Sequence, residues 1–277
     1  CYYIDPSPTG CGGSGCSDNN AGTTRATAWV TFANVNHGDI GAMNAVELGA
    51  GDVLYVMAGM ITDISSDGQR ILYIRNQDGT SGNPLKIRPY PGAWWAVTLD
   101  GSTSFADTST SGSIVEFYLT DYVEFEGFRI TGGYGAGLRN DIDGTTGAVY
   151  RRNLIYDNRG AGANNPAGMY IHTCNDCIIS HNFLYDNGDA GGSQNNHQIV
   201  AFRGTGTRFH HNRYWLSDAA GFVAEFSHCF KYKHSQASLT ATAESDREIF
   251  INCNNGLSSG QAGHHIHDNI FLDSSDY

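Results

Sequence analysis

The sequence predicts an all-β fold, a right-handed parallel β-helix, and three observations lead to it. One short pattern returns along the second half of the chain: a β-prone pair, two polar residues, an Asn, and two or three apolar or aromatic residues. The Asn residues of successive copies, Asn153, Asn182 and Asn212, recur at intervals of 29 and 30 residues. Gly, Asn and Asp gather between the copies, whereas Ile, Phe, Tyr and Val fill them. A period of this length is typical of a solenoid.

The repeating unit reads as strands, because each copy alternates polar and apolar residues over a few positions. One such coil cannot bury its apolar face alone, so it must stack on the next and pair parallel strands along the axis. An Asn at the same corner of every coil tolerates a left-handed bend, and its amide can bond to the coils on either side. Two copies, 230–234 and 248–252, are weak; the clear ones are 149–156, 178–185, 208–215 and 265–272.

The composition fits one elongated domain with a continuous core. The chain has 277 residues, and 40% of them are hydrophobic, which excludes a disordered protein. No run of 18 apolar residues is present, so we expect a soluble chain with no transmembrane segment. The net charge of −12 argues against nucleic acid as a partner, because phosphate binding needs a basic face. Most Lys and Arg residues lie from Arg129 onward, which leaves room for a local cationic groove.

Cysteine usage points to an oxidising compartment, and we expect a secreted or cell-surface protein. The chain starts at Cys1 with no leader, as a mature exported protein would, although a fragment boundary would look the same. Cys1 is left over and could carry a lipid, join another chain or stay free. The spacing of Cys174 and Cys177 also fits half a zinc site. The expected disulfides are Cys11 with Cys16, Cys174 with Cys177 and, if their strands are neighbours, Cys229 with Cys253.

The start of the chain resembles secreted right-handed β-helix proteins of the pectate lyase-like superfamily. Residues 2–10, 51–63 and 84–92 carry this likeness. In those proteins a first strand, a short capping helix and a strand beginning with Gly-Asp lead into the coils. The resemblance therefore implies a capping helix at 36–48. We assign residues 1–65 to an N-terminal lead-in and cap, and 66–277 to the coils of the same domain. The likeness is specific for fold rather than for reaction.

The strongest local anomaly is the segment 230–235, Phe-Lys-Tyr-Lys-His-Ser. As a weak copy of the repeat, it places Lys231 in the column that holds Tyr150, Ile179 and Phe209 in other coils. A shift by one residue would instead put Lys233 at the Asn position. A charge at such a position breaks the local rule, which is typical of a functional site. In the alternative, both ammonium groups reach solvent from an outward face.

Other ionisable residues fall on strands expected beside these lysines. Arg203 ends one strand, 198–203, and Glu225 and His228 lie on the corresponding strand of the next coil, 222–228. Adjacent coils are roughly 5 Å apart, so the three side chains should approach one another. The same strand one coil earlier carries Tyr170 and His172. A plain surface ion pair between Arg203 and Glu225 is the alternative.

Such a cluster could remove the proton beside a uronate carboxylate and stabilise the resulting enolate, which is β-elimination. Lys231, Lys233 or His228 would be the general base. An Arg or a bound cation would hold the carboxylate.

The pair Lys233 and Ser235 resembles the strand that carries the basic Lys in polysaccharide lyases of the chondroitinase B and alginate lyase kind. Those enzymes have two Glu residues before the Lys, serving calcium, and an Arg on the next coil. Here only Glu225 precedes it, and 258–264 contains no Arg. Calcium stays open as a cofactor. Asp186, Asn187 and Asp189 could supply other ligands for it. In the alternative, these residues simply form a turn.

Two further chemistries are weaker alternatives. Alternating residues in a strand share one face, so a transition metal could bind His264, His265, His267 and Asp268. A glycosidase would need two carboxyl groups across a groove, and the candidates are Glu225 with Asp141 or Asp218.

The prediction is a secreted carbohydrate-active enzyme that cleaves an acidic polysaccharide, by elimination rather than hydrolysis. Arg139, Tyr170 and His172 would bind substrate in a groove along the axis. The alternative is a non-catalytic adhesin, tailspike-like or filament-forming β-helix that self-associates through an open C-terminal coil. The two differ in whether the lysines point into a groove or into the stack. The predicted catalytic residues are Lys231, Lys233, Arg203, Glu225 and His228.

Overall fold

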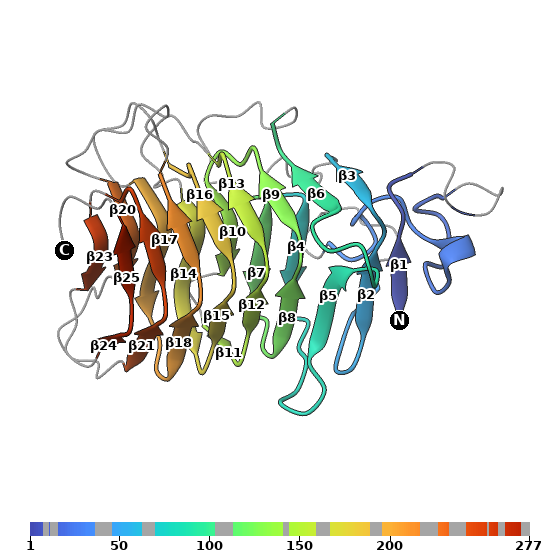
Figure 1. Ribbon diagram of the computed structural model, residues 1–277. Coiled ribbons are helices and arrows are strands. Elements are labelled where there is room, and N and C mark those ends of the chain that lie inside the picture. Colours follow the sequence, from blue (N-terminus) through green and yellow to red (C-terminus); the bar gives the residue numbers. More distant parts are fainter. Residues whose placement is uncertain are drawn as a thin grey trace.

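The computed structural model describes residues 1–7, 11, 16–36, 46–62, 70–102, 113–140, 144–158, 167–188, 196–216, 227–232, 242–253, 255–259 and 264–272. These residues form a parallel β-helix, with β1 (Tyr2–Ile4) and β25 (Ile270–Leu272) at opposite ends of the stack (Figure 1). Every pairing between named strands is parallel, and the strands form three sheets. The predicted all-β, parallel architecture is therefore confirmed.

Each complete coil contributes one strand to each sheet, while the coils at the two ends are incomplete. Sheet A is β1, β2 (Val53–Val56), β5 (Leu85–Pro89), β8 (Val123–Glu126), β12 (Val149–Arg151), β15 (Ile178–Ser180), β18 (Thr207–His210), β21 (Ala243–Asp246) and β24 (His264–His267). Sheet B is β3 (Gly59–Ile61), β6 (Val97–Asp100), β9 (Arg129–Thr131), β13 (Leu154–Tyr156), β16 (Phe183–Tyr185), β19 (Arg213–Trp215), β22 (Ile249–Ile251) and β25. Sheet C is β4 (Leu72–Arg75), β7 (Val115–Tyr118), β10 (Ala136–Asn140), β14 (Ala167–Asn175), β17 (Asn196–Arg203), β20 (Ser227–Tyr232) and β23 (Asn255–Ser259), with β11 (Thr145–Thr146) beside β14.

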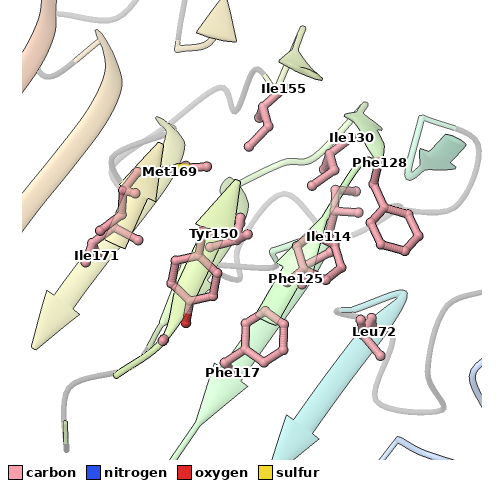
Figure 2. Packing of buried hydrophobic residues seen from close by; sticks show 14 of the residues in the cluster. Leu72, Ile114, Phe117, Phe125, Phe128, Ile130, Tyr150, Ile155, Met169 and Ile171 are labelled. Carbon is pink, nitrogen blue, oxygen red and sulfur yellow. The ribbon is translucent and has the colours of Figure 1, made fainter. Parts of the chain in front are cut away.

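The core is a stack of apolar side chains from alternate positions of these strands (Figure 2). Successive strand residues point to opposite faces, so one set fills the interior and the other faces outward. Phe125 stacks on Phe128 with 4.5 Å between ring centroids, and Tyr150 of the next coil stacks on Phe117 at 5.5 Å. The outward set is left for recognition and chemistry.

A ladder of side chains inside the turns between sheets A and B links successive coils. The backbone N–H of Asn153 donates to Asn182 Oδ1 at 3.0 Å, and that of Asn182 donates to Asn212 Oδ1 at 3.0 Å. Each amide also donates to a backbone carbonyl of the preceding coil, as Asn182 Nδ2 does to Tyr150 O at 2.9 Å. These residues are buried, so the ladder satisfies polar groups that no water reaches. The bonding expected for the repeated Asn is confirmed. The left-handed bend is not at the Asn: the residue before it adopts that conformation, as at Arg152, His181 and His211.

One rung of this ladder is an acid. Glu248 lies between β21 and β22 and accepts from Asn212 Nδ2 at 3.1 Å, while its own N–H donates to Asn269 Oδ1 at 2.8 Å. The predicted copy at 248–252, with Asn252 at the Asn position, is therefore wrong by several residues. The coil between Asn212 and Glu248 is 36 residues long, which hides the register.

A second, shorter ladder lies where sheet B turns toward sheet C. Gly133 N donates to Asn158 Oδ1 at 2.9 Å, and Asn158 N donates to Asn187 Oδ1 at 3.2 Å. Asn187 Nδ2 then donates to Gln198 Oε1 at 2.7 Å. Two of the three corners of the coil are thus fixed by buried amides.

The capping helix expected at 36–48 is not seen: Asn36 and residues 46–48 are not helical, and 37–45 lie outside the described residues. Side chains pair with the edge of sheet C instead. Asn36 Nδ2 donates to Ile71 O at 3.1 Å, and Tyr73 N donates to Asn36 Oδ1 at 2.8 Å. Buried Trp29 and Phe32 belong to the cluster that fills the core. The nearest helical piece described is the 3₁₀ turn η1 (Arg25–Thr27).

Lys231 does not occupy the column predicted for it. β20 pairs with β17 in sheet C, where Lys231 lies opposite Val200, whereas Ser245 of β21 takes the place beside Phe209 in sheet A. Phe230 and Tyr232 on either side of Lys231 are buried in the core, so strand alternation directs the lysine outward. Lys233 lies outside the described residues.

The three expected disulfides are present: Cys11–Cys16, Cys174–Cys177 and Cys229–Cys253. The thiol of Cys1 is free and exposed. Since Cys174 and Cys177 bond to each other, the alternative of half a zinc site is excluded. Among the described residues, no helix is long and apolar enough to cross a membrane.

Candidate active-site face

One line of residues crosses sheet C in register on the side away from the core, although Glu116 and Val200 within it are buried. Arg139 of β10 lies opposite Tyr170 of β14, Tyr170 opposite Val200 of β17, and Val200 opposite Lys231 of β20. Toward the N-terminal end the line continues through Glu116 and Tyr73. We call these residues the sheet C row: Tyr73, Glu116, Arg139, Tyr170, Val200 and Lys231.

The first part of the row is an internal ion pair. Arg70 Nε lies 2.7 Å from Glu116 Oε2, and the Arg70 guanidinium lies over the Tyr73 ring at 4.4 Å. The Glu116 side chain is only 3% exposed, so its charge is neutralised at close range rather than presented to a ligand. We therefore take this pair as structural.

The middle of the row brings three predicted binding residues together. The Arg139 guanidinium lies 5.5 Å from the Tyr170 ring centroid, and the Tyr170 and His172 rings are 6.2 Å apart. The His172 backbone N–H donates to Asn140 Oδ1 at 2.7 Å, which fixes β14 against β10. A cation, a phenol and an imidazole from adjacent strands thus face the same side.

Lys231 lies farther along the row and is half-buried. Three strand steps separate it from Arg139, which corresponds to about 14 Å at the usual strand spacing. The two cations therefore cannot act on the same atom of one small group. They suit an extended ligand that passes over several strands.

The other predicted catalytic residues are placed only in part. Arg203 ends β17 opposite Thr173, and His228 lies in β20 opposite His197, but the side chains of Arg203 and His228 are outside the described set. Glu225 and Lys233 lie outside the described residues altogether. Asp141 and Asp218, considered for a glycosidase, do so too. The structure brings together Arg139, Tyr170 and His172, with Lys231 on the same face.

The residues considered for a metal site do not come together as metal ligands where the structure describes them. Asn187 is buried in the second ladder, so it cannot serve calcium beside Asp186, and Asp189 is not described. His264 packs against the Tyr232 ring at 5.0 Å between centroids. His267 is hydrogen-bonded to Glu244 at 3.0 Å instead of converging with His264. Where ligand atoms do gather, at Asp5, Cys11 and Cys16, the two thiols form a disulfide. Among the described residues none of these groups assembles a set of calcium ligands, and calcium as a cofactor stays a prediction.

Sequence reasoning missed two features. One is the Arg70–Glu116 pair, which joins residues 46 positions apart and leaves no local signal. The other is a line of basic residues and histidines directly before the ladder, of which Arg152, His181 and His211 are members. Its signal was visible, because each clear copy of the repeat has a polar residue before its Asn.

Solved structures share this fold. The pectate lyase Pel9A matches with a TM-score of 0.62 at 16% identity, over 100% of this chain and 76% of that one. A rhamnogalacturonan lyase matches with a TM-score of 0.55 at 16% identity, over 98% of this chain and 72% of that one. The sequence matches no protein-family model and no curated protein. The predicted likeness to the pectate lyase-like superfamily is thus confirmed for the fold.

Proposed function

We propose that this pectate lyase-like β-helix is an exported carbohydrate-active enzyme that binds an acidic polysaccharide along sheet C and cleaves it by β-elimination. The observation that carries the proposal is the register of the sheet C row, which aligns Arg139, Tyr170 and Lys231 on one outward face. The three disulfides support a protein that works in an oxidising environment.

The elimination needs a base, an anion-binding group and a proton for the leaving oxygen. The base removes the proton on the carbon that bears the uronate carboxylate. The electron pair forms a carbon–carbon double bond, the glycosidic carbon–oxygen bond breaks, and the leaving oxygen takes up a proton. A lysine can be the base in its neutral form. We assign this role to Lys231, with Lys233 as the alternative on the same segment.

We assign roles to the remaining predicted residues from their places in the chain relative to Lys231. Arg203 ends the strand next to Lys231, and we propose that it holds the carboxylate of the reacting sugar. Glu225 and His228 would protonate the leaving oxygen or orient the base. Arg139, about 14 Å away, would bind a carboxylate on a neighbouring sugar, with Tyr170 and His172 beside it.

The test is the ultraviolet absorbance of unsaturated uronate products during incubation with polygalacturonate, alginate and glycosaminoglycans, with calcium and then with chelator. We expect a rise on one substrate that Lys231→Ala reduces at least about 100-fold. Lys86→Ala is the matched control, because Lys86 lies on sheet A, 33% exposed, beside Glu124. New reducing ends without absorbance would indicate hydrolysis. Silence in both assays would favour the non-catalytic alternative.

A further inference from the structure

A column of basic and imidazole side chains lies on the outer side of the turns between sheets A and B. Its members adopt left-handed backbone angles, with φ of 56° at Arg152, 57° at His181, 57° at His211 and 56° at Arg247. They occupy consecutive coils, because Arg152 N donates to Ser180 O and His181 N donates to His210 O. We call Arg152, His181, His211 and Arg247 the turn-edge column.

The two central members stack along the solenoid axis. The His181 and His211 rings are parallel within 3°, with 4.9 Å between centroids. At the N-terminal end the Arg152 guanidinium lies 5.7 Å from the Trp94 ring centroid, and Trp94 is 45% exposed. The rings stack face to face, and His211 Nδ1 lies 2.9 Å from His210 Nδ1, so Nε2 is the nitrogen of His211 that is left for a ligand. The column therefore offers one group able to hydrogen-bond for each coil.

On this edge the acidic side chains are buried and the basic side chains are exposed. Arg152 lies 3.5 Å from Glu126, and Arg247 lies 3.4 Å from Asp246. The two carboxylates are 2% and 0% exposed, whereas the two guanidinium side chains are 51% and 56% exposed. The acids hold the arginines from below, so an approaching molecule meets cations first. The exposed ends of Arg152 and Arg247 are thus cationic, although the net charge of the whole chain is −12.

We propose that the turn-edge column is a second, non-catalytic binding site for an acidic polysaccharide. The chain runs from sheet C to sheet A, then to sheet B and back to sheet C, so this corner does not border the sheet C row. The site would hold a chain laid along the axis, with carboxylates on Arg152 and Arg247 and hydroxyl groups on His181 and His211.

The spacing favours a polysaccharide over other polyanions. Coils repeat at about 4.8 Å along the axis, a step comparable to one sugar of an extended glycan. Trp94 is an exposed aromatic surface suited to a sugar ring. A single-stranded nucleic acid would need several open ring faces for its bases, whereas the imidazole faces are used against each other. The turn-edge column is a different surface from the proposed active site, so binding there does not require that the sheet C row be catalytic.

The experiment measures binding of polygalacturonate and alginate by calorimetry and affinity electrophoresis, in a Lys231→Ala background to prevent turnover. The variant is Arg152→Asn with Arg247→Asn, because Asn accepts left-handed backbone angles. Arg213→Gln, an exposed arginine of sheet B, is the matched control. We expect the double variant to bind about tenfold more weakly, a loss of about 1.4 kcal/mol, with shallower salt dependence. The melting temperature should not change, because Arg151 at 2.6 Å from Glu126 and Arg208 at 2.9 Å from Asp246 still neutralise the two carboxylates. The control should bind as the parent does.

Three results would overturn the proposal: unchanged affinity in the folded double variant, equal weakening by Arg213→Gln, or equally tight binding of single-stranded DNA. Activity on short oligosaccharides, measured with Lys231 restored, should be the same in the double variant as in the parent. A loss of that activity would also count against a separate site.

Discussion

Two columns of side chains run along the same turns, one residue apart in sequence and on opposite sides of the backbone. The inner column, Asn153, Asn182, Asn212, Glu248 and Asn269, is buried or half-buried and hydrogen-bonded from coil to coil. The outer column reads Gly127, Arg152, His181, His211, Arg247 and Asp268. The inner chemistry is nearly constant because buried backbone groups must be satisfied. The outer chemistry varies, so it is where binding specificity can be placed.

The largest effect should come from breaking the inner column. Asn182→Ala removes the acceptor of Asn153 N–H and Nδ2 and the donor to Tyr150 O, all buried. We expect a loss of about 4 kcal/mol in the free energy of unfolding, because buried donors are left unsatisfied. Denaturant unfolding measures it. His181→Asn, one residue away on the outer side, should change stability by less than about 1 kcal/mol; equal losses would contradict the division between columns.

The next largest effect should come from replacing the acidic rung, Glu248, with an amide. Burial raises the pKa of Glu248 from 4.5 to about 8. The folded state therefore keeps a proton that the unfolded state releases, and stability should fall as pH rises from about 4.5 to 8, then level off. Glu248→Gln should remove this slope and raise the melting temperature most at pH 8. A slope that persists in the variant would show that another group causes it.

At Gly127, a position of the outer column, the backbone conformation and the packing of Trp94 determine which residue fits. Gly127 has φ of 86°, and an added Cβ would lie 2.4 Å from the Trp94 ring. Gly127→Ala should cost about 1 to 2 kcal/mol and displace Trp94. Unfolding and tryptophan fluorescence quenching measure both effects. An unchanged quenching profile would mean that Trp94 does not depend on this glycine.

The smallest effect is the titration of His181, in the outer column, and of His210 beside it. Burial first, then His211, Arg152 and Arg151, lower the pKa of His181 below 6.5. Burial also lowers that of His210, with Arg208 acting in the same direction and Asp246 against it. Because unfolding would then bind protons, stability should fall slightly as pH drops through about 6.5.

Titration of the imidazole ring protons by NMR tests this directly. His267 is the internal contrast, because hydrogen bonds to Asp268 and then Glu244 raise its pKa. We expect His181 and His210 to titrate below His267. The reverse order would mean that these two imidazoles are more hydrated than their packing implies.

The fold could be predicted because the repeat is local: Asn153, Asn182 and Asn212 are spaced evenly, and alternation fixes which neighbours point inward. Where the Asn spacing is irregular, the predicted register of the strands was wrong. The 36 residues from Asn212 to Glu248 and the acid at the Asn position led Lys231 to be assigned to the wrong sheet. Its direction was recoverable only from the packing of Phe230 and Tyr232, which is a tertiary property.

Part of the arrangement of the candidate residues could be predicted from the sequence, but not their distances. Tyr170 and His172 were expected one coil before Arg203, and β14 does pair with β17. The separation of Arg139 from Lys231 by three strands could not be read from the sequence, because it depends on how many residues each coil inserts between sheets. Such insertions leave the core unchanged and therefore follow no packing rule.

The inner ladder has a direction. The N–H of each rung donates to the side chain of the rung that follows it in the chain, from Phe128 through Glu248. A coil is thus completed only when the next one has arrived. During synthesis, which proceeds from the N-terminus, each new coil would supply the hydrogen-bond acceptors that the preceding coil lacks. The last coil formed would therefore always be the least stable one.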